Sequence, residues 1–140
     1  MAFTVPSAQL THAAVLEMMH AAVAKAEEIG QPQCIVIVDA SGETLGQLRM
    51  TGAKFLSLKS ARSKARTAAS NRAQSAAIPQ DFRTPIAFAT GGEVTGLPGG
   101  LPIKMGDEVI GGIGIGSGTG DQDIAVGNAA LAAIGAETFS

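Results

Sequence analysis

The chain has 140 residues, a length that fits one domain over residues 1–140 and excludes a two-domain arrangement. Hydrophobic residues make up 46% of the chain and charged residues 16%, which is typical of a compact folded protein and not of a disordered or coiled-coil one. The formal net charge of −2, with five Phe as the only aromatic residues, argues against nucleic-acid binding.

The single cysteine, Cys34, excludes an internal disulfide, a CxxC zinc site and covalent haem attachment through CxxCH. The sequence contains no run of about 18 apolar residues that could span a bilayer. Residues 1–6 carry no Lys or Arg, unlike the start of an export signal. We therefore expect a cytoplasmic protein with no membrane partner.

The first elements follow from hydrophobic periodicity. Apolar residues recur at three- and four-residue intervals over residues 7–29, which predicts an amphipathic helix capped by Ser7. Residues 34–38 read Cys-Ile-Val-Ile-Val and predict a central strand, because they are apolar on both faces and mostly β-branched. Residues 39–42 offer turn chemistry, so residues 43–50 are expected to form the second strand of a hairpin.

The second half of the chain is expected to continue with a helix, three strands and a last helix. Residues 57–77 are rich in Ala, Ser, Lys and Arg and contain no Gly or Pro, so they predict a helix. The remaining predicted elements are a third strand at 86–90, a glycine-rich loop at 91–100, two strands at 101–105 and 108–115 joined by Gly106-Asp107, and a helix at about 121–135.

This order of elements predicts an α+β fold. Hairpins join the strands instead of βαβ crossovers, so the sheet should be mostly antiparallel. Strands that are apolar on both faces need helices on both sides. We therefore expect a three-layer α/β/α sandwich around a five-stranded antiparallel sheet.

Glycines occupy alternate positions of the last predicted strand. Gly112, Gly114 and Gly116 share one face, where another element or a ligand could approach the backbone closely. The run 111–120 fits neither GxGxxG nor a P-loop, which argues against a nucleotide site. Two interpretations stay open: the glycines serve tight packing of a helix or neighbouring subunit, or they line a ligand site.

Positive charge is concentrated between residues 44 and 80, a stretch that contains no Asp or Glu. On the predicted helix Lys64 and Thr67 lie one turn apart on the same face, an arrangement suited to holding a carboxylate. A solvated basic helix, or ion pairs to a neighbouring subunit, would explain the same charges. If Lys64 is instead buried among alanines, it becomes a candidate base or amine nucleophile.

The two histidines, His12 and His20, are eight residues apart and do not form an HxxxH metal pair. A surface or packing role is therefore expected for each. They are nonetheless the only imidazoles that the chain offers to a haem iron.

Three segments carry a family resemblance. They are residues 37–50, which begin Ile-Val-Asp-Ala-Ser-Gly; residues 57–68, Ser-Leu-Lys-Ser-Ala-Arg-Ser-Lys-Ala-Arg-Thr-Ala; and residues 98–123, which contain Pro-Gly-Gly-Leu-Pro-Ile and Gly-Gly-Ile-Gly-Ile-Gly-Ser-Gly-Thr-Gly-Asp-Gln-Asp. Together they resemble the GlcG/HbpS-like family, the haem-degrading domain also found at the C-terminus of PduO-type proteins. The resemblance implies a profilin-like fold and assembly into homo-oligomers.

The motif match also implies a pocket near a subunit boundary, formed by Lys64, Thr67, Gly99, Gly100 and Gly118. Some members of the family bind haem, so haem is the one cofactor that the resemblance implies. The first hypothesis is a protein that binds haem or a small organic carboxylate at this basic, glycine-lined pocket. If haem binds, apolar contacts would hold the macrocycle, Lys or Arg its propionates, and the two histidines would be candidate axial donors.

The second hypothesis is a cofactor-independent enzyme, such as an isomerase, lyase or hydratase of small-acid or aromatic-acid catabolism. Lys64 would then be the catalytic base or anchor, and backbone N–H groups of the Gly99-Gly100 loop would stabilise an oxyanion. A third hypothesis, a structural partner of an adjacent enzyme, predicts neither a ligand nor turnover.

Overall fold

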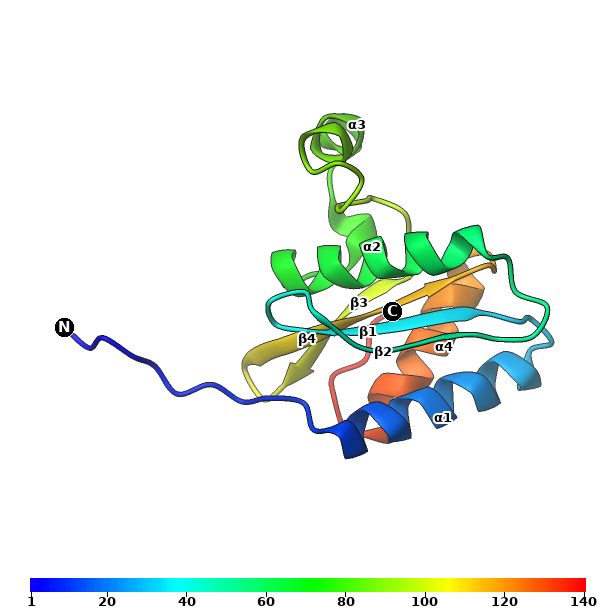
Figure 1. Ribbon diagram of the computed structural model, residues 1–140, viewed down its shortest axis with the longest axis horizontal. Coiled ribbons are helices and arrows are strands. Elements are labelled where there is room, and N and C mark those ends of the chain that lie inside the picture. Colours follow the sequence, from blue (N-terminus) through cyan, green and yellow to red (C-terminus); the bar gives the residue numbers. More distant parts are fainter.

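The computed structural model describes residues 1–140 and has an α+β fold, as predicted. Helix α2 covers one face of the sheet, α1 and α4 cover the other, and α3 stands apart beyond α2 (Figure 1). No helix combines the length and the apolar character needed to cross a membrane. The elements are α1 (His12–Glu28), β1 (Cys34–Asp39), β2 (Thr44–Arg49), α2 (Leu56–Asn71), a 3₁₀ turn (Ser75–Ala77), α3 (Gln80–Ala89), β3 (Gly100–Met105), β4 (Glu108–Gly116) and α4 (Gly120–Ala133).

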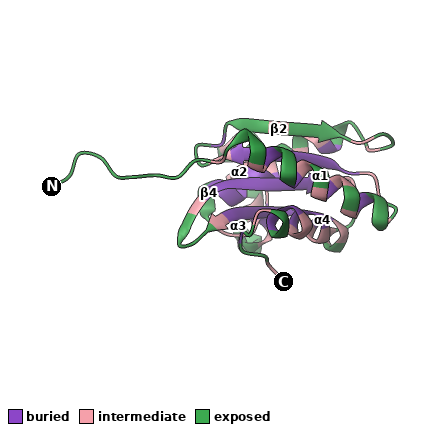
Figure 2. Ribbon diagram, turned by 90° about the horizontal axis from the view of Figure 1, so that it is seen from below, coloured by how far each residue is buried: buried purple, intermediate pink, exposed green.

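The sheet has four strands in the order β2-β1-β4-β3, and all neighbours are antiparallel, as predicted. Opposite residues include Ile35 with Ile115 in the central pair, and Leu101 with Ile113 in the β3–β4 hairpin. The two central strands are buried, whereas the edge strand β2 is exposed along almost its whole length (Figure 2). Both predicted hairpins are present.

The prediction of five strands is wrong because residues 86–90 form no strand. Residues 86–89 are the last residues of α3, and Thr90 is its C-cap. The short apolar run looked like a strand, but Phe82, Pro85, Ile86 and Ala89 recur at helical spacing and line one side of α3. The helix begins directly after Pro79, where a missing backbone N–H costs nothing.

Two predicted helix boundaries also need correction. The first helix begins at His12, and its cap is Thr11, whose hydroxyl accepts from the Ala14 N–H at 3.1 Å; Ser7 lies in an extended segment. The second helix ends at Asn71 instead of Ala77, because the next residue adopts a left-handed conformation.

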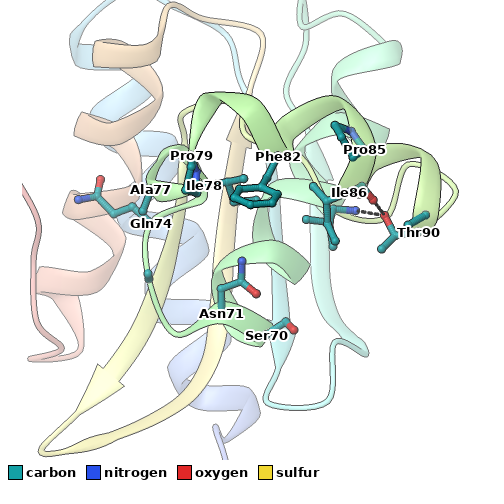
Figure 3. Close-up of a pocket in the computed structure, with 13 residues that line it drawn as sticks. Ser70, Asn71, Gln74, Ala77, Ile78, Pro79, Phe82, Pro85, Ile86 and Thr90 are labelled. Atoms are coloured by element: carbon teal, nitrogen blue, oxygen red, sulfur yellow. Dashed lines mark hydrogen bonds between the residues drawn. The ribbon is translucent and has the colours of Figure 1, made fainter.

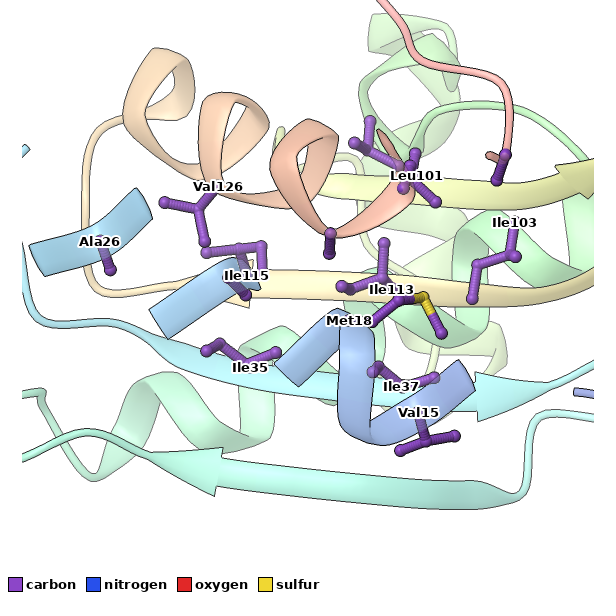
Figure 4. Close-up of a cluster of buried hydrophobic side chains, with 14 of the residues drawn as sticks. Val15, Met18, Ala26, Ile35, Ile37, Leu101, Ile103, Ile113, Ile115 and Val126 are labelled. Atoms are coloured by element: carbon purple, nitrogen blue, oxygen red, sulfur yellow. The ribbon is translucent and has the colours of Figure 1, made fainter. Parts of the chain in front are cut away.

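The larger of two hydrophobic clusters lies between the sheet and helices α1 and α4 (Figure 4). Its largest fully buried side chains are those of Met18, Ile35, Ile37, Leu101, Ile103, Ile113, Ile115, Val126 and Leu131. The smaller cluster, between the sheet and α2, joins valines of β1 to alanines of α2. Short side chains on that side let α2 lie very close to the sheet.

The alternate glycines of β4 explain this close approach. A Cβ at Gly112 would overlap the carbonyl oxygen of Ala65, and one at Gly114 would overlap that of Ala61. A Cβ at Gly116 would lie 2.8 Å from the carbonyl oxygen of Ser57. The glycine face of β4 is therefore filled by the backbone of α2, and the packing interpretation holds for these three glycines.

Replacing Gly114 with Ala should destabilise the fold, because the added methyl group meets backbone atoms that cannot rotate away. We expect the free energy of unfolding, measured by urea denaturation, to fall by about 1–3 kcal/mol. Leu45→Ala on the exposed edge strand is the control and should cost much less. Equal losses in the two variants would contradict this account of the packing of α2.

Candidate functional site

Lys64 lies on the face of α2 that packs against β4, and it is 5% exposed. Its Nζ donates to the carbonyl oxygen of Ile115 at 2.7 Å and to Oδ2 of Asp123 at 3.1 Å. Asp123 belongs to the first turn of α4 and is 2% exposed. The predicted ligand anchor is thus a buried cation that already has a carboxylate partner within the chain.

Burial raises the pKa of Asp123 above its usual value, and the charge of Lys64 opposes this rise. The Gly118 N–H donates to Oδ1 of Asp123 at 3.1 Å and also favours the carboxylate. Gln33 is fully buried beside them. Its amide is near enough to favour the carboxylate, but neither of its polar atoms makes a hydrogen bond of good geometry.

Two of the three predicted site glycines, Gly99 and Gly118, border this ion pair, and Gly100 lies against the backbone of Lys64. A Cβ at Gly99 would lie 2.8 Å from the carbonyl oxygen of Ile115 and 3.2 Å from Nζ of Lys64. A Cβ at Gly118 would lie 2.8 Å from both Oδ1 of Asp123 and Nε2 of Gln33. At Gly100 it would overlap the carbonyl group of Lys64. The fold therefore brings the three glycines close to Lys64 or to its partner Asp123, as the family resemblance implies, and leaves no space for a side chain at any of them.

Thr67 sits one turn further along α2 and is fully buried. Its hydroxyl donates to the carbonyl oxygen of Ser63 at 2.7 Å and accepts from the Thr95 N–H at 3.0 Å, which ties α2 to the glycine-rich loop. None of the five main cavities is lined by Lys64, Thr67 or the three glycines. Within this chain, these residues form a closed polar centre.

The largest of the five main cavities lies instead between the end of α2 and helix α3, and we call it the α2–α3 cleft. Its volume is about 660 Å³. Phe82 and Ile86 of α3 and Asn71 of α2 face the space between the two segments (Figure 3). The complete lining is Ser70, Asn71, Ala73, Gln74, Ala77, Ile78, Pro79, Phe82, Pro85, Ile86, Ala89, Thr90 and Val94.

Helix α3 forms the outer wall of this cleft and packs against no other helix or strand. None of its residues is buried, and Phe82 is 63% exposed. Arg83 anchors the segment before it, because its guanidinium group donates to the carbonyl oxygens of Ala76 and Ile78, each at 3.0 Å. The Thr90 hydroxyl donates back to the carbonyl oxygen of Ile86 at 2.7 Å, at the end of the helix.

The two histidines lie far from this region in the fold. His12 and His20 are exposed residues of α1, which covers the opposite face of the sheet and makes no contact with α2. No group of three or more His, Cys, Asp or Glu side chains is placed to hold a metal ion. Burial raises the pKa of the Cys34 thiol, so this residue is an unreactive member of the core.

Sequence reasoning missed Asp123, Gln33 and the α2–α3 cleft. Asp123 and Gln33 are far from Lys64 in the chain, and only the fold brings them together. The cleft had a usable signal, since apolar residues at helical spacing between 82 and 89 indicate one side of a helix.

The profile of the family described as "Haem degrading protein HbpS-like" matches residues 10–132. The chain is 32% identical over 138 residues to the corrinoid adenosyltransferase PduO of Citrobacter freundii, a match that covers 95% of this chain and 41% of PduO. The chain therefore spans less than half of the length of that enzyme.

Two crystal structures are similar over almost their whole length. Klebsiella pneumoniae protein ORFY has a TM-score of 0.90 at 28% identity, covering 96% of this chain and 97% of that chain. PduOC, solved as a complex with haem, has a TM-score of 0.87 at 27% identity, covering 95% of this chain and 100% of that chain.

Replacing Lys64 with Met leaves the buried carboxylate of Asp123 without its cation. We expect the free energy of unfolding to fall by about 3–5 kcal/mol near neutral pH, measured by urea denaturation. Lys59→Met, at an exposed position of the same helix, is the control and should change stability little.

This loss should depend on pH. Lys64 lowers the pKa of Asp123, so its removal lets burial raise that pKa further. In the variant the carboxyl group then takes up a proton at a higher pH, which relieves the cost of the buried charge. The destabilisation relative to wild type should therefore be smaller at about pH 5 than at about pH 8. A loss that is the same at both pH values would contradict the role given to Asp123.

Proposed function

The chain belongs to the HbpS-like family, and on that premise we propose that it binds haem in the α2–α3 cleft. The observation that carries the proposal is an apolar cleft of about 660 Å³ beside a helix that packs against no other helix or strand. Ligand sites in proteins commonly have volumes of about 300–1,000 Å³ and mostly apolar walls. Similarity to PduOC, which was solved with haem, supports the choice of ligand.

The residues that line the cleft can contact the porphyrin ring of a haem, but none of them can bind its iron. Phe82, Ile86 and Ile78 offer apolar surface to a porphyrin face, but the lining contains no His, Cys, Met or Tyr. An axial donor would have to come from outside the cleft. His12 or His20 of another copy of the chain would meet this need if the chain assembles as its family resemblance implies, and both stay predicted ligands.

The enzyme alternative has less support from the geometry. A catalytic Lys64 would have to leave two hydrogen-bond partners, and a cavity would have to open beside Gly99. A small organic carboxylate could bind Lys64 only by displacing Asp123, because the Lys64 amine already forms an ion pair with that carboxylate. A ligand that combines an apolar face with carboxylates fits the open cleft better.

Titration with haemin, followed by the Soret absorbance, tests the proposal. The full chain should bind haemin saturably, and Phe82→Ser and Ile86→Ser should each weaken binding about 10- to 100-fold. This range corresponds to the loss of about 1.5–3 kcal/mol that a large apolar side chain contributes.

The matched control is Phe55→Ser, at the opposite end of α2, where the side chain is 76% exposed and lines none of the main cavities. It should leave haemin affinity unchanged. Absence of saturable binding to the unaltered chain would reject the function, and an equal loss in Phe55→Ser would place the ligand elsewhere.

A further inference from the structure

A second, polar cavity opens beside the α2–α3 cleft. It has a volume of about 420 Å³, and its lining includes two guanidinium groups, those of Arg66 and Arg72. Ser70 and Val94 line both cavities, so the two lie next to each other along α2. A single ligand could therefore reach from apolar walls to positive charge, and we call the polar part the arginine pocket.

The arginines of this pocket differ in their partners. Arg66 forms an ion pair with Glu93, with 2.8 Å between Nη1 and Oε2. Arg72, the left-handed residue that ends α2, forms no ion pair. The Arg66 side chain is 26% exposed and that of Glu93 52% exposed, so solvent screens their attraction. Surface pairs of this kind contribute little to stability and are easily exchanged.

Glu93 lies in the loop that follows α3. It follows Gly91 and Gly92, which both have positive φ and no atoms within 4 Å of the place where a Cβ would be. The segment is tied to α2 on either side of Glu93, by a hydrogen bond from the Ser63 hydroxyl to Gly92 and by one from the Thr95 N–H to Thr67. Glu93 itself is bound to α2 only through Arg66.

We propose that the arginine pocket binds the carboxylate edge of a planar ligand, and that Glu93 occupies Arg66 until a ligand carboxylate replaces it. This inference rests on the function proposed for the α2–α3 cleft. The macrocycle would lie against the apolar walls, and its two carboxylates would meet Arg66 and Arg72. A guanidinium group suits this task because it can donate two parallel hydrogen bonds to one carboxylate.

The charges of the pocket agree with this assignment. In the free protein two arginines face one glutamate, which leaves one positive charge uncompensated. A ligand with two carboxylates supplies a partner for each guanidinium group and releases Glu93 to solvent. Glu93 thus acts as an internal competitor that weakens the binding of carboxylate ligands.

The test uses iron-free protoporphyrin IX and its dimethyl ester, with porphyrin fluorescence as the readout, so that iron ligation plays no part. Arg66→Gln and Arg72→Gln should each weaken binding of the diacid about tenfold, the usual size of a hydrogen-bonded charge contact. Neither should change binding of the ester. Glu93→Gln should tighten binding of the diacid by up to about fivefold, in line with a weak surface pair.

Arg62→Gln is the matched control, since Arg62 is an exposed arginine of the same helix that lines none of the main cavities. Arg66→Lys keeps the charge without the planar geometry and should give an intermediate affinity. If both porphyrins bind the unaltered chain and all variants behave like Arg62→Gln, the inference is wrong and the proposed function stands. If the unaltered chain binds haemin but neither iron-free porphyrin, the inference is wrong and the proposed function stands; if it binds none of the three, both are wrong.

Discussion

The contact of α2 with the glycine face of β4 is the constraint on which the rest of the structure depends. Because Gly112 and Gly114 have no side chains, the helix lies with its carbonyl groups directly over the strand. This close packing carries Lys64 into the interior, where it must find a carboxylate or lose its charge. Asp123 of α4 is that carboxylate, so a pair from two helices joins both faces of the sheet.

The same constraint decides where a ligand can bind. No room remains between α2 and the sheet, and Gly99 and Gly118 close the space around the ion pair. The open surface of α2 is its outer side, where α3 is held away from the body of the protein (Figure 1). At that end of α2, Arg72 is exposed and has no ion pair, and Arg66 is partly exposed and paired with Glu93, whereas Lys64 is buried with Asp123.

The sequence predicted most of the fold because its strands, hairpins and helices have strong local signals. It failed at residues 86–90, since the short run Ile-Ala-Phe-Ala-Thr, taken alone, fits a strand as well as a helix. The meeting of Lys64 with Gly99 and Gly118 followed from the family resemblance. The partner Asp123 could not be predicted, because its contact with Lys64 spans 59 positions and depends on how α4 crosses the sheet. The spacing of apolar residues between 82 and 89 indicates one side of a helix, but it does not indicate that this helix stands apart from the sheet and leaves a cleft.

The most direct test of the account is a crystal structure of the full chain with haemin bound. We expect the porphyrin between α2 and α3, against Phe82 and Ile86, with its carboxylates within hydrogen-bonding distance, about 3 Å, of Arg66 and Arg72. The ion pair of Lys64 and Asp123 should be intact. A porphyrin bound beside Lys64, with that pair broken, would contradict the account.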